Sequence, residues 1–136
     1  MSRYMSIDYG EKRVGIAITD HLKLFVTPLV TIANQSEEYL FSELFKIIKE
    51  QEVERIIIGL PLNIEGEDTD KTKEVRNFYD KLSNLTKLPL VFFDERYSST
   101  VAEELLKNKG LNWRESKNSV DMIAAAVILN DYLNNR

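Results

Sequence analysis

The stretch 5–20 constrains the fold of this chain more than any other part of the sequence. Two apolar segments, 3–9 and 13–20, are interrupted by small residues rather than by helix formers, which is typical of β-strands. The turn between them contains Gly10, for which we predict a positive φ, and Gly15 leaves the second strand open to a close neighbour. The stretch therefore predicts a tight hairpin at the start of the chain.

The rest of the sequence alternates strand and helix patterns. Residues 25–33 form a third predicted strand, and Pro28 within it suits the edge of a sheet. Residues 53–60 are almost continuously apolar, as in a strand covered on both faces, and the helical patterns on either side of it imply parallel pairing. The other expected elements are a helix over 36–51, a helix from 73 onward, a strand over 90–94, and helices over 98–109 and 119–134.

Between these elements, residues 63–72 are rich in charge and lack an apolar period, so we predict an exposed, mobile loop there. The order of elements predicts an α/β fold with a five-stranded mixed sheet, in which three antiparallel strands are followed by two parallel strands and helices flank the sheet. A length of 136 residues suits a single domain over 1–136.

Composition narrows the function. The chain contains no cysteine, which excludes disulfides and thiolate metal sites and leaves hard cations held by oxygen as the expected metals. A net charge of -4 argues against sequence-blind coating of nucleic acid, because that binding neutralises many phosphates. No segment has the pattern of a leader peptide or a membrane span, so we expect a cytoplasmic protein without a membrane partner.

Four sequence blocks, taken together and in this order, carry a family resemblance. The first is the opening hairpin, and the others are Gly59-Leu60-Pro61-Leu62-Asn63 with Gly66, Asp94-Glu95-Arg96-Tyr97-Ser98-Ser99, and Val120-Asp121-Met122-Ile123-Ala124-Ala125. They resemble the YqgF/RuvX-like family of the ribonuclease H-like superfamily, which is similar to the bacterial Holliday junction resolvases. The opening block alone is less specific, because an Asp-x-Gly turn also begins the actin-like and sugar-kinase ATPases.

The resemblance implies that Asp8, Glu95 and Asp121 are catalytic residues that bind divalent metal, Mg²⁺ or Mn²⁺, with two ions expected. Two such ions can activate water and neutralise the leaving oxygen of a phosphodiester, and they require several carboxylates at one place. Lys12, Arg13 and Arg96 are candidates for binding substrate phosphate, since charge-assisted hydrogen bonds suit phosphate oxygens.

Each acidic position also has a structural alternative. Asp8 could accept hydrogen bonds from the turn that follows it. Asp94 and Glu95 point to opposite faces of a strand, so only one of them can lie on the face of Asp8, and the family resemblance favours Glu95. Asp121 follows Asn118 by three residues, much like a capping box. The basic residues could simply be solvated.

The resemblance implies a nuclease that processes the 5′ end of precursor 16S ribosomal RNA, with nucleic acid in a ribosomal particle as its partner. Resolution of Holliday junctions in branched DNA is the alternative, and a non-catalytic nucleic-acid-binding or transcription-coupled factor of the same fold is another. An ATPase related to sugar kinases would need two such domains, and this chain has length for one. The sequence leaves open whether the protein is a monomer or a homodimer.

Overall fold

A computed structural model describes residues 2–95 and 117–135 of the chain. Its sheet has five strands in the order β3-β2-β1-β4-β5. The strands are β1 (Arg3–Asp8), β2 (Arg13–Thr19), β3 (Val26–Ala33), β4 (Val53–Leu60) and β5 (Leu90–Asp94). The described helices are α1 (Glu37–Glu50), α2 (Asp70–Leu85) and α4 (Lys117–Asn134).

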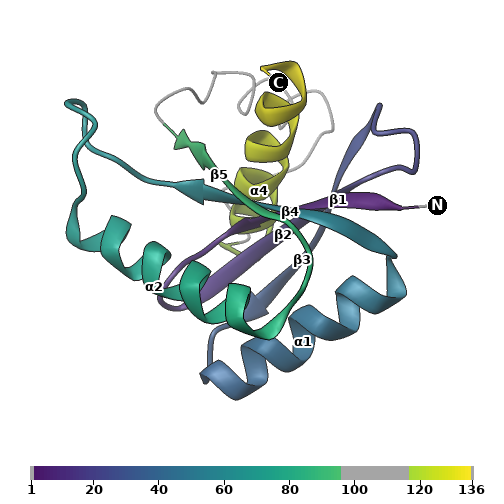
Figure 1. Cartoon of the computed structure of the whole chain (residues 1–136), viewed down its shortest axis with the longest axis horizontal. Coiled ribbons are helices and arrows are strands. Elements are labelled where there is room, and N and C mark those ends of the chain that lie inside the picture. Colours follow the sequence, from purple (N-terminus) through teal and green to yellow (C-terminus); the bar gives the residue numbers. More distant parts are fainter. Residues whose placement is uncertain (1, 96–116, 136) are drawn as a thin grey trace.

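The pairing of the strands confirms the predicted mixed sheet. β1 pairs antiparallel with β2, which pairs antiparallel with β3, while β4 lies parallel to both β1 and β5. The carboxyl ends of β1, β4 and β5 therefore meet at one edge of the sheet (Figure 1). The turn that leads from β1 into β2 lies at the same edge.

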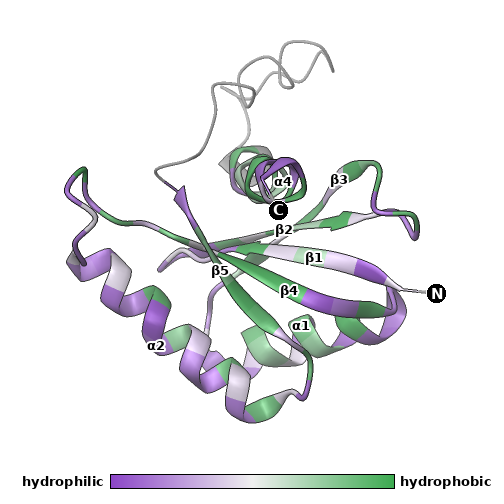
Figure 2. Ribbon diagram, turned by 45° about the horizontal axis from the view of Figure 1, so that its top comes forward, coloured by the Kyte–Doolittle hydropathy of each residue, from purple (hydrophilic) through white to green (hydrophobic). Residues whose placement is uncertain are grey.

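The helices cover the two faces of the sheet unequally. α1 and α2 lie on one face and α4 lies on the other, as Figure 2 shows. Along β1, Met5 and Ile7 are fully buried in the cluster beneath α1 and α2, and each such side chain contributes about 1.5–3 kcal/mol on burial. Ser6 faces the opposite way, and its hydroxyl donates a hydrogen bond to the carbonyl of Ala125 in α4. Successive residues of β1 therefore point alternately to the face covered by α1 and α2 and to the face covered by α4.

Two differences from the expected elements concern the connection between β4 and α2. The helix begins at Asp70 rather than near 73, because Thr69 caps it and Thr72 returns the hydrogen bond in a capping box. The segment before it is ordered by hydrogen bonds and includes an antiparallel bridge between Leu62 and Asp68. The segment 63–72 is exposed over most of its length, as predicted, but its last residues, 70–72, belong to α2 rather than to a loop.

Some of the remaining predictions concern described residues, and others concern residues outside the described ranges. The strands over 53–60 and 90–94 are confirmed at the expected bounds. The helix expected over 98–109 and the substrate-binding candidate Arg96 lie outside the described residues. Within the described ranges, no helix combines the length and the apolar character needed to cross a membrane.

Candidate active site

Asp8 ends β1 on the side of the sheet that α4 covers. In the register of the hairpin, Asp8 lies opposite Gly15 of β2. A Cβ atom at Gly15 would lie 1.9 Å from the backbone carbonyl oxygen of Asp121, a separation that no pair of such atoms tolerates. The close neighbour predicted for Gly15 is therefore the beginning of α4, and the missing side chain brings Asp121 to the strand beside Asp8.

Gly10 is required for a different reason from the predicted one. The only described glycine with a positive φ is Gly66, so the expectation of a positive φ at Gly10 was wrong. A Cβ atom at Gly10 would instead lie 2.4 Å from the carbonyl oxygen of Arg13. Glycine is needed because the two arms of the turn pass close to each other.

Glu95 reaches the same face of the sheet from β5. Phe93, two residues earlier, packs in the cluster beneath α4, whereas Phe92 packs against the other cluster. The Glu95 carboxylate lies over Gly59 of β4, where an added Cβ would come within 2.5 Å of its Oε1 atom. Glu95 and not Asp94 therefore shares the face of Asp8, which is the choice that the family resemblance favoured.

Asp121 lies in the second turn of α4, beyond the position of a capping residue. The helix begins at Lys117, so the capping-box alternative for Asp121 does not apply. Its Oδ2 atom accepts a hydrogen bond from Nε of Arg13 at 2.8 Å, and the two side chains are 23% and 35% exposed. The positive charge of Arg13 thus offsets the free-energy cost of partly removing the Asp121 carboxylate from water.

The charges of these residues are coupled. The pKa of Asp8 is raised to about 7, first by burial and then by the negative charges of Glu95 and Asp121, against the positive charge of Lys71. The pKa of Glu95 is also raised, first by burial and then by Asp94, again against Lys71. The three acids form one electrostatic cluster.

Lys71 is the residue of this site that the sequence did not reveal. It lies in the first turn of α2, and its charge favours the ionised forms of both Asp8 and Glu95. Lys71 fell within the loop predicted over 63–72, and the position of a side chain in such a loop cannot be predicted from the sequence. The capping pattern Thr69 to Thr72 was the available signal, but it lacks the Glu or Gln that usually marks a capping box.

Asp8, Glu95 and Asp121 are thus gathered at one edge, with Arg13 held to Asp121 and Lys12 exposed on the turn. Carboxylate oxygens are the donors that suit a hard divalent cation. In the part of the chain that the structure describes, however, no three acidic or histidine side chains stand close enough to enclose one ion. The donor set fits Mg²⁺ or Mn²⁺ in chemistry, whereas Asp121 is engaged with Arg13.

The raised pKa of Asp8 predicts how stability varies with pH. A carboxyl whose pKa rises from 3.8 unfolded to about 7 folded stabilises the fold below pH 4, and this contribution is lost as the pH rises through 7. The full shift corresponds to roughly 4 kcal/mol, and water at the site reduces it, so we expect about 2 kcal/mol. In EDTA, Asp8→Asn should therefore be the more stable protein at pH 8.

Urea unfolding of both proteins at pH 4 and pH 8 measures this difference. The groups that bear on Asp8 are Glu95, Asp121 and Lys71, and the last of these reduces the effect. Equal free energies of unfolding at pH 8 would show that the Asp8 carboxyl is solvated rather than buried.

The fold defines the class of protein. Two solved structures of RuvC from Thermus thermophilus share this fold. One has a TM-score of 0.60 and 11% identity over 97% of this chain and 95% of that chain; the other, in complex with a Holliday junction substrate, has a TM-score of 0.58 and 12% identity over 98% and 96%. The chain therefore has a ribonuclease H-like fold, which confirms the predicted fold class.

Sequence comparison then identifies the family. The family described as RuvX, Holliday junction resolvase, matches residues 2–135, so this chain belongs to the RuvX family. A relative from Maridesulfovibrio salexigens is 44% identical over 96% of this chain and 97% of its own length. Another from Chloroflexus aurantiacus is 37% identical over 97% and 86%. Both relatives bear the name "Putative pre-16S rRNA nuclease".

Proposed function

We propose that this protein is a divalent-metal-dependent nuclease that hydrolyses phosphodiester bonds at the 5′ end of precursor 16S ribosomal RNA. The observation that carries the proposal is the half-buried acidic cluster, in which Glu95 and Asp121 raise the pKa of Asp8. A protein retains such repulsion where a cation relieves it during function. The names of the relatives support the choice of substrate.

In this proposal Asp8, Glu95 and Asp121 hold Mg²⁺ or Mn²⁺, with two ions expected. The bound metal supplies activation of water and neutralisation of charge at the phosphate. At neutral pH, a carboxyl with a pKa of about 7 is half protonated, so Asp8 needs a nearby positive charge to become fully ionised. The charge of Lys71 already favours the ionised form at this pKa, and a bound cation would supply the further positive charge.

Arg13 has two partners available in the proposed reaction. Its guanidinium now binds Asp121 through Nε, and a phosphate oxygen is an equally suitable acceptor. Transfer of Arg13 from Asp121 to the substrate would free the carboxylate for metal at the moment when the substrate arrives. Lys12, exposed on the same turn, and Arg96 are proposed to position the neighbouring phosphates.

Glu95 and Asp94 provide a matched pair of variants to test the site. Glu95→Gln should reduce cleavage of a precursor 16S fragment in Mg²⁺ by at least roughly 100-fold, because it removes a charge that the metal requires. Asp94→Asn changes the adjacent carboxylate on the opposite face and should stay within about 3-fold of wild type, since it provides no ligand. Initial rates with and without EDTA measure both.

The same assay separates the rival functions. Faster cleavage of four-way DNA junctions than of precursor rRNA would support junction resolution. The family is described as a Holliday junction resolvase, and the similar RuvC structure contains a Holliday junction substrate. Binding of RNA without cleavage in either metal would support a non-catalytic factor. Equal activity of Glu95→Gln and wild type would contradict the proposed mechanism.

A further inference from the structure

Two of the acids at the edge of the sheet share one neighbour, Gly59 of β4. Ile7 of β1 pairs with Ile58 of β4, so the next residue of each strand, Asp8 and Gly59, lie side by side where the strands end. The Glu95 carboxylate lies over the same glycine, since an added Cβ there would come within 2.5 Å of its Oε1 atom. The position of Gly59 therefore marks the centre of the acidic cluster.

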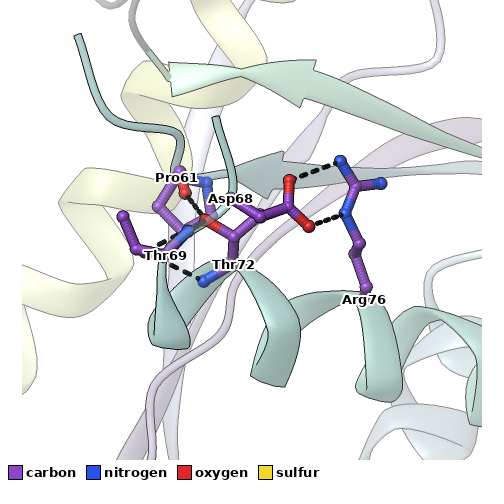
Figure 3. A network of polar contacts seen from close by, with 5 residues as sticks. All are labelled: Pro61, Asp68, Thr69, Thr72 and Arg76. Carbon is purple, nitrogen blue, oxygen red and sulfur yellow. Dashed lines mark hydrogen bonds and ion pairs between the residues drawn. The ribbon is translucent and has the colours of Figure 1, made fainter. Parts of the chain in front are cut away.

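The first turn of α2 is fastened just beyond this glycine, as Figure 3 shows. The hydroxyl of Thr72 donates a hydrogen bond to the carbonyl of Pro61, which follows the glycine by two residues. Asp68, just before the helix, accepts two hydrogen bonds from Arg76, at 2.7 and 3.0 Å. These contacts fix the start of the helix, and Lys71 immediately precedes Thr72 in its first turn.

Lys71 brings a positive charge to both acids. Burial raises the pKa of Asp8 and of Glu95, and at each carboxyl the charge of Lys71 opposes that rise. The side chain of Lys71 is exposed, and in the part of the chain that the structure describes it forms no ion pair. An ammonium group on a flexible stem is a compact charge that changes partners readily. Lys71 is therefore a cation near the carboxylates that no direct contact holds to them.

This charge affects metal and substrate in opposite ways. Like charges repel and unlike charges attract, with an energy that falls with distance. Lys71 therefore repels a divalent cation held by Asp8 and Glu95, but it attracts the negative charge of a phosphodiester. A phosphate oxygen is also a better partner for an ammonium group than water is, because the hydrogen bond is charge-assisted. Without substrate the lysine disfavours metal, and with substrate it has a partner that the metal also attracts.

We propose that Lys71 lowers the affinity of the acidic cluster for divalent cations in the absence of substrate and binds a phosphate of the substrate when it arrives. The inference rests on the proposed nuclease function and deepens it, because it makes the uptake of metal depend on the substrate. A substrate that engages Lys71 removes the repulsion, so metal and substrate bind cooperatively, and each raises the affinity for the other by the same factor.

The first test measures binding of Mn²⁺ alone to the metal-free protein by isothermal titration calorimetry at pH 8. Lys71→Gln removes the charge, so it should bind Mn²⁺ about 5-fold more tightly than wild type. Lys71→Arg keeps the charge and should bind like wild type. Lys73→Gln is the matched control, because Lys73 is also exposed on α2 but residues two apart on a helix do not share a side. Its Mn²⁺ affinity should equal that of wild type.

The second test adds a precursor 16S fragment at saturating Mn²⁺, where differences in metal affinity no longer matter. Loss of a phosphate contact in Lys71→Gln should raise KM about 10-fold while kcat stays within about 3-fold of wild type. The slope of log(kcat/KM) against log salt concentration should become shallower by about 1. Lys71→Arg should keep the KM of wild type, and so should Lys73→Gln.

The two tests separate this inference from the proposed function. Equal Mn²⁺ affinity of Lys71→Gln and wild type would overturn the inference, whereas cleavage by wild type would still support the nuclease. A higher KM without tighter Mn²⁺ binding would likewise contradict the proposed coupling. Tighter Mn²⁺ binding by Lys71→Gln, without cleavage by wild type, would support the effect of Lys71 on the cation and overturn the nuclease. Failure of all four proteins to bind Mn²⁺ would overturn both.

Discussion

Asp8→Asn is expected to lower metal-dependent cleavage by at least roughly 1,000-fold while the protein remains folded, since metal stabilisation of transition-state charge is worth several kcal/mol. Asparagine keeps the size of the side chain and removes the charge. Asp8 is the acid on which the other two act, because the charges of Glu95 and Asp121 both raise its pKa. Loss of this charge therefore weakens cation binding at the centre of the cluster.

Asp20→Asn is the control for this variant. Asp20 also follows the end of a strand, but at the opposite end of the sheet, where its Oδ1 atom accepts hydrogen bonds from the amides of Leu24 and Phe25. An asparagine oxygen can accept the same bonds, so activity should equal that of wild type. Cleavage assays in Mg²⁺ and Mn²⁺ with circular dichroism of all three proteins decide the matter. Comparable rates for Asp8→Asn and wild type would disprove a metal role for Asp8.

Cation binding gives a second readout that does not depend on finding the right substrate. Mn²⁺ should raise the melting temperature of wild type and should raise it little in Asp8→Asn, because a ligand stabilises only the state that binds it. The shift in wild type should grow between pH 6 and pH 8, as Asp8 loses the proton that competes with the cation. An identical shift in both proteins would place the cation elsewhere.

Patterns close together in the sequence predicted most of the fold. The β4 segment was recognisable because Ile56, Ile57 and Ile58 are consecutive and all fully buried, with apolar layers on both sides. The order of residues 61–69, which connect β4 to α2, was not recognisable, because it depends on hydrogen bonds between this segment and α2. Asp68 binds Arg76 eight positions later and Pro61 binds Thr72 eleven positions later, and neither separation follows a strand or helix period.

The candidate site was predicted through resemblance and alternation rather than through geometry. Alternation along β5 allowed only one of Asp94 and Glu95 on the face of Asp8, and the resemblance selected Glu95, which the structure places there. The ion pair between Arg13 and Asp121 joins residues 108 positions apart, and sequence alone gave Arg13 only a role toward phosphate. Lys71 was missed because its position depends on where α2 begins. Local sequence patterns predict which face of a strand a residue occupies. Ion pairs between residues far apart in the sequence can be identified only once the packed fold is known.

Gly15→Ala is the substitution expected to cost the most stability, at least about 3 kcal/mol in the free energy of unfolding. The added methyl would lie 1.9 Å from the carbonyl oxygen of Asp121 and 2.8 Å from the amide nitrogen of Met122. These are backbone atoms, so no side-chain rotation can relieve the overlap. The whole of α4 would have to move away from β2, uncovering the buried cluster that includes Ala125 and Leu129.

Gly66→Ala provides the contrast, because it changes a glycine of positive φ in the connection between β4 and α2 and should cost only about 1 kcal/mol. Urea unfolding followed by circular dichroism measures both variants. Movement of α4 would also separate Asp121 from Asp8 and Arg13, so a Gly15→Ala protein that still folds in the cold should bind Mn²⁺ poorly, whereas Gly66→Ala should bind it normally. Near wild-type stability of Gly15→Ala would mean that α4 does not rest on β2 at this position, and the acidic cluster would then lack the contact that assembles it.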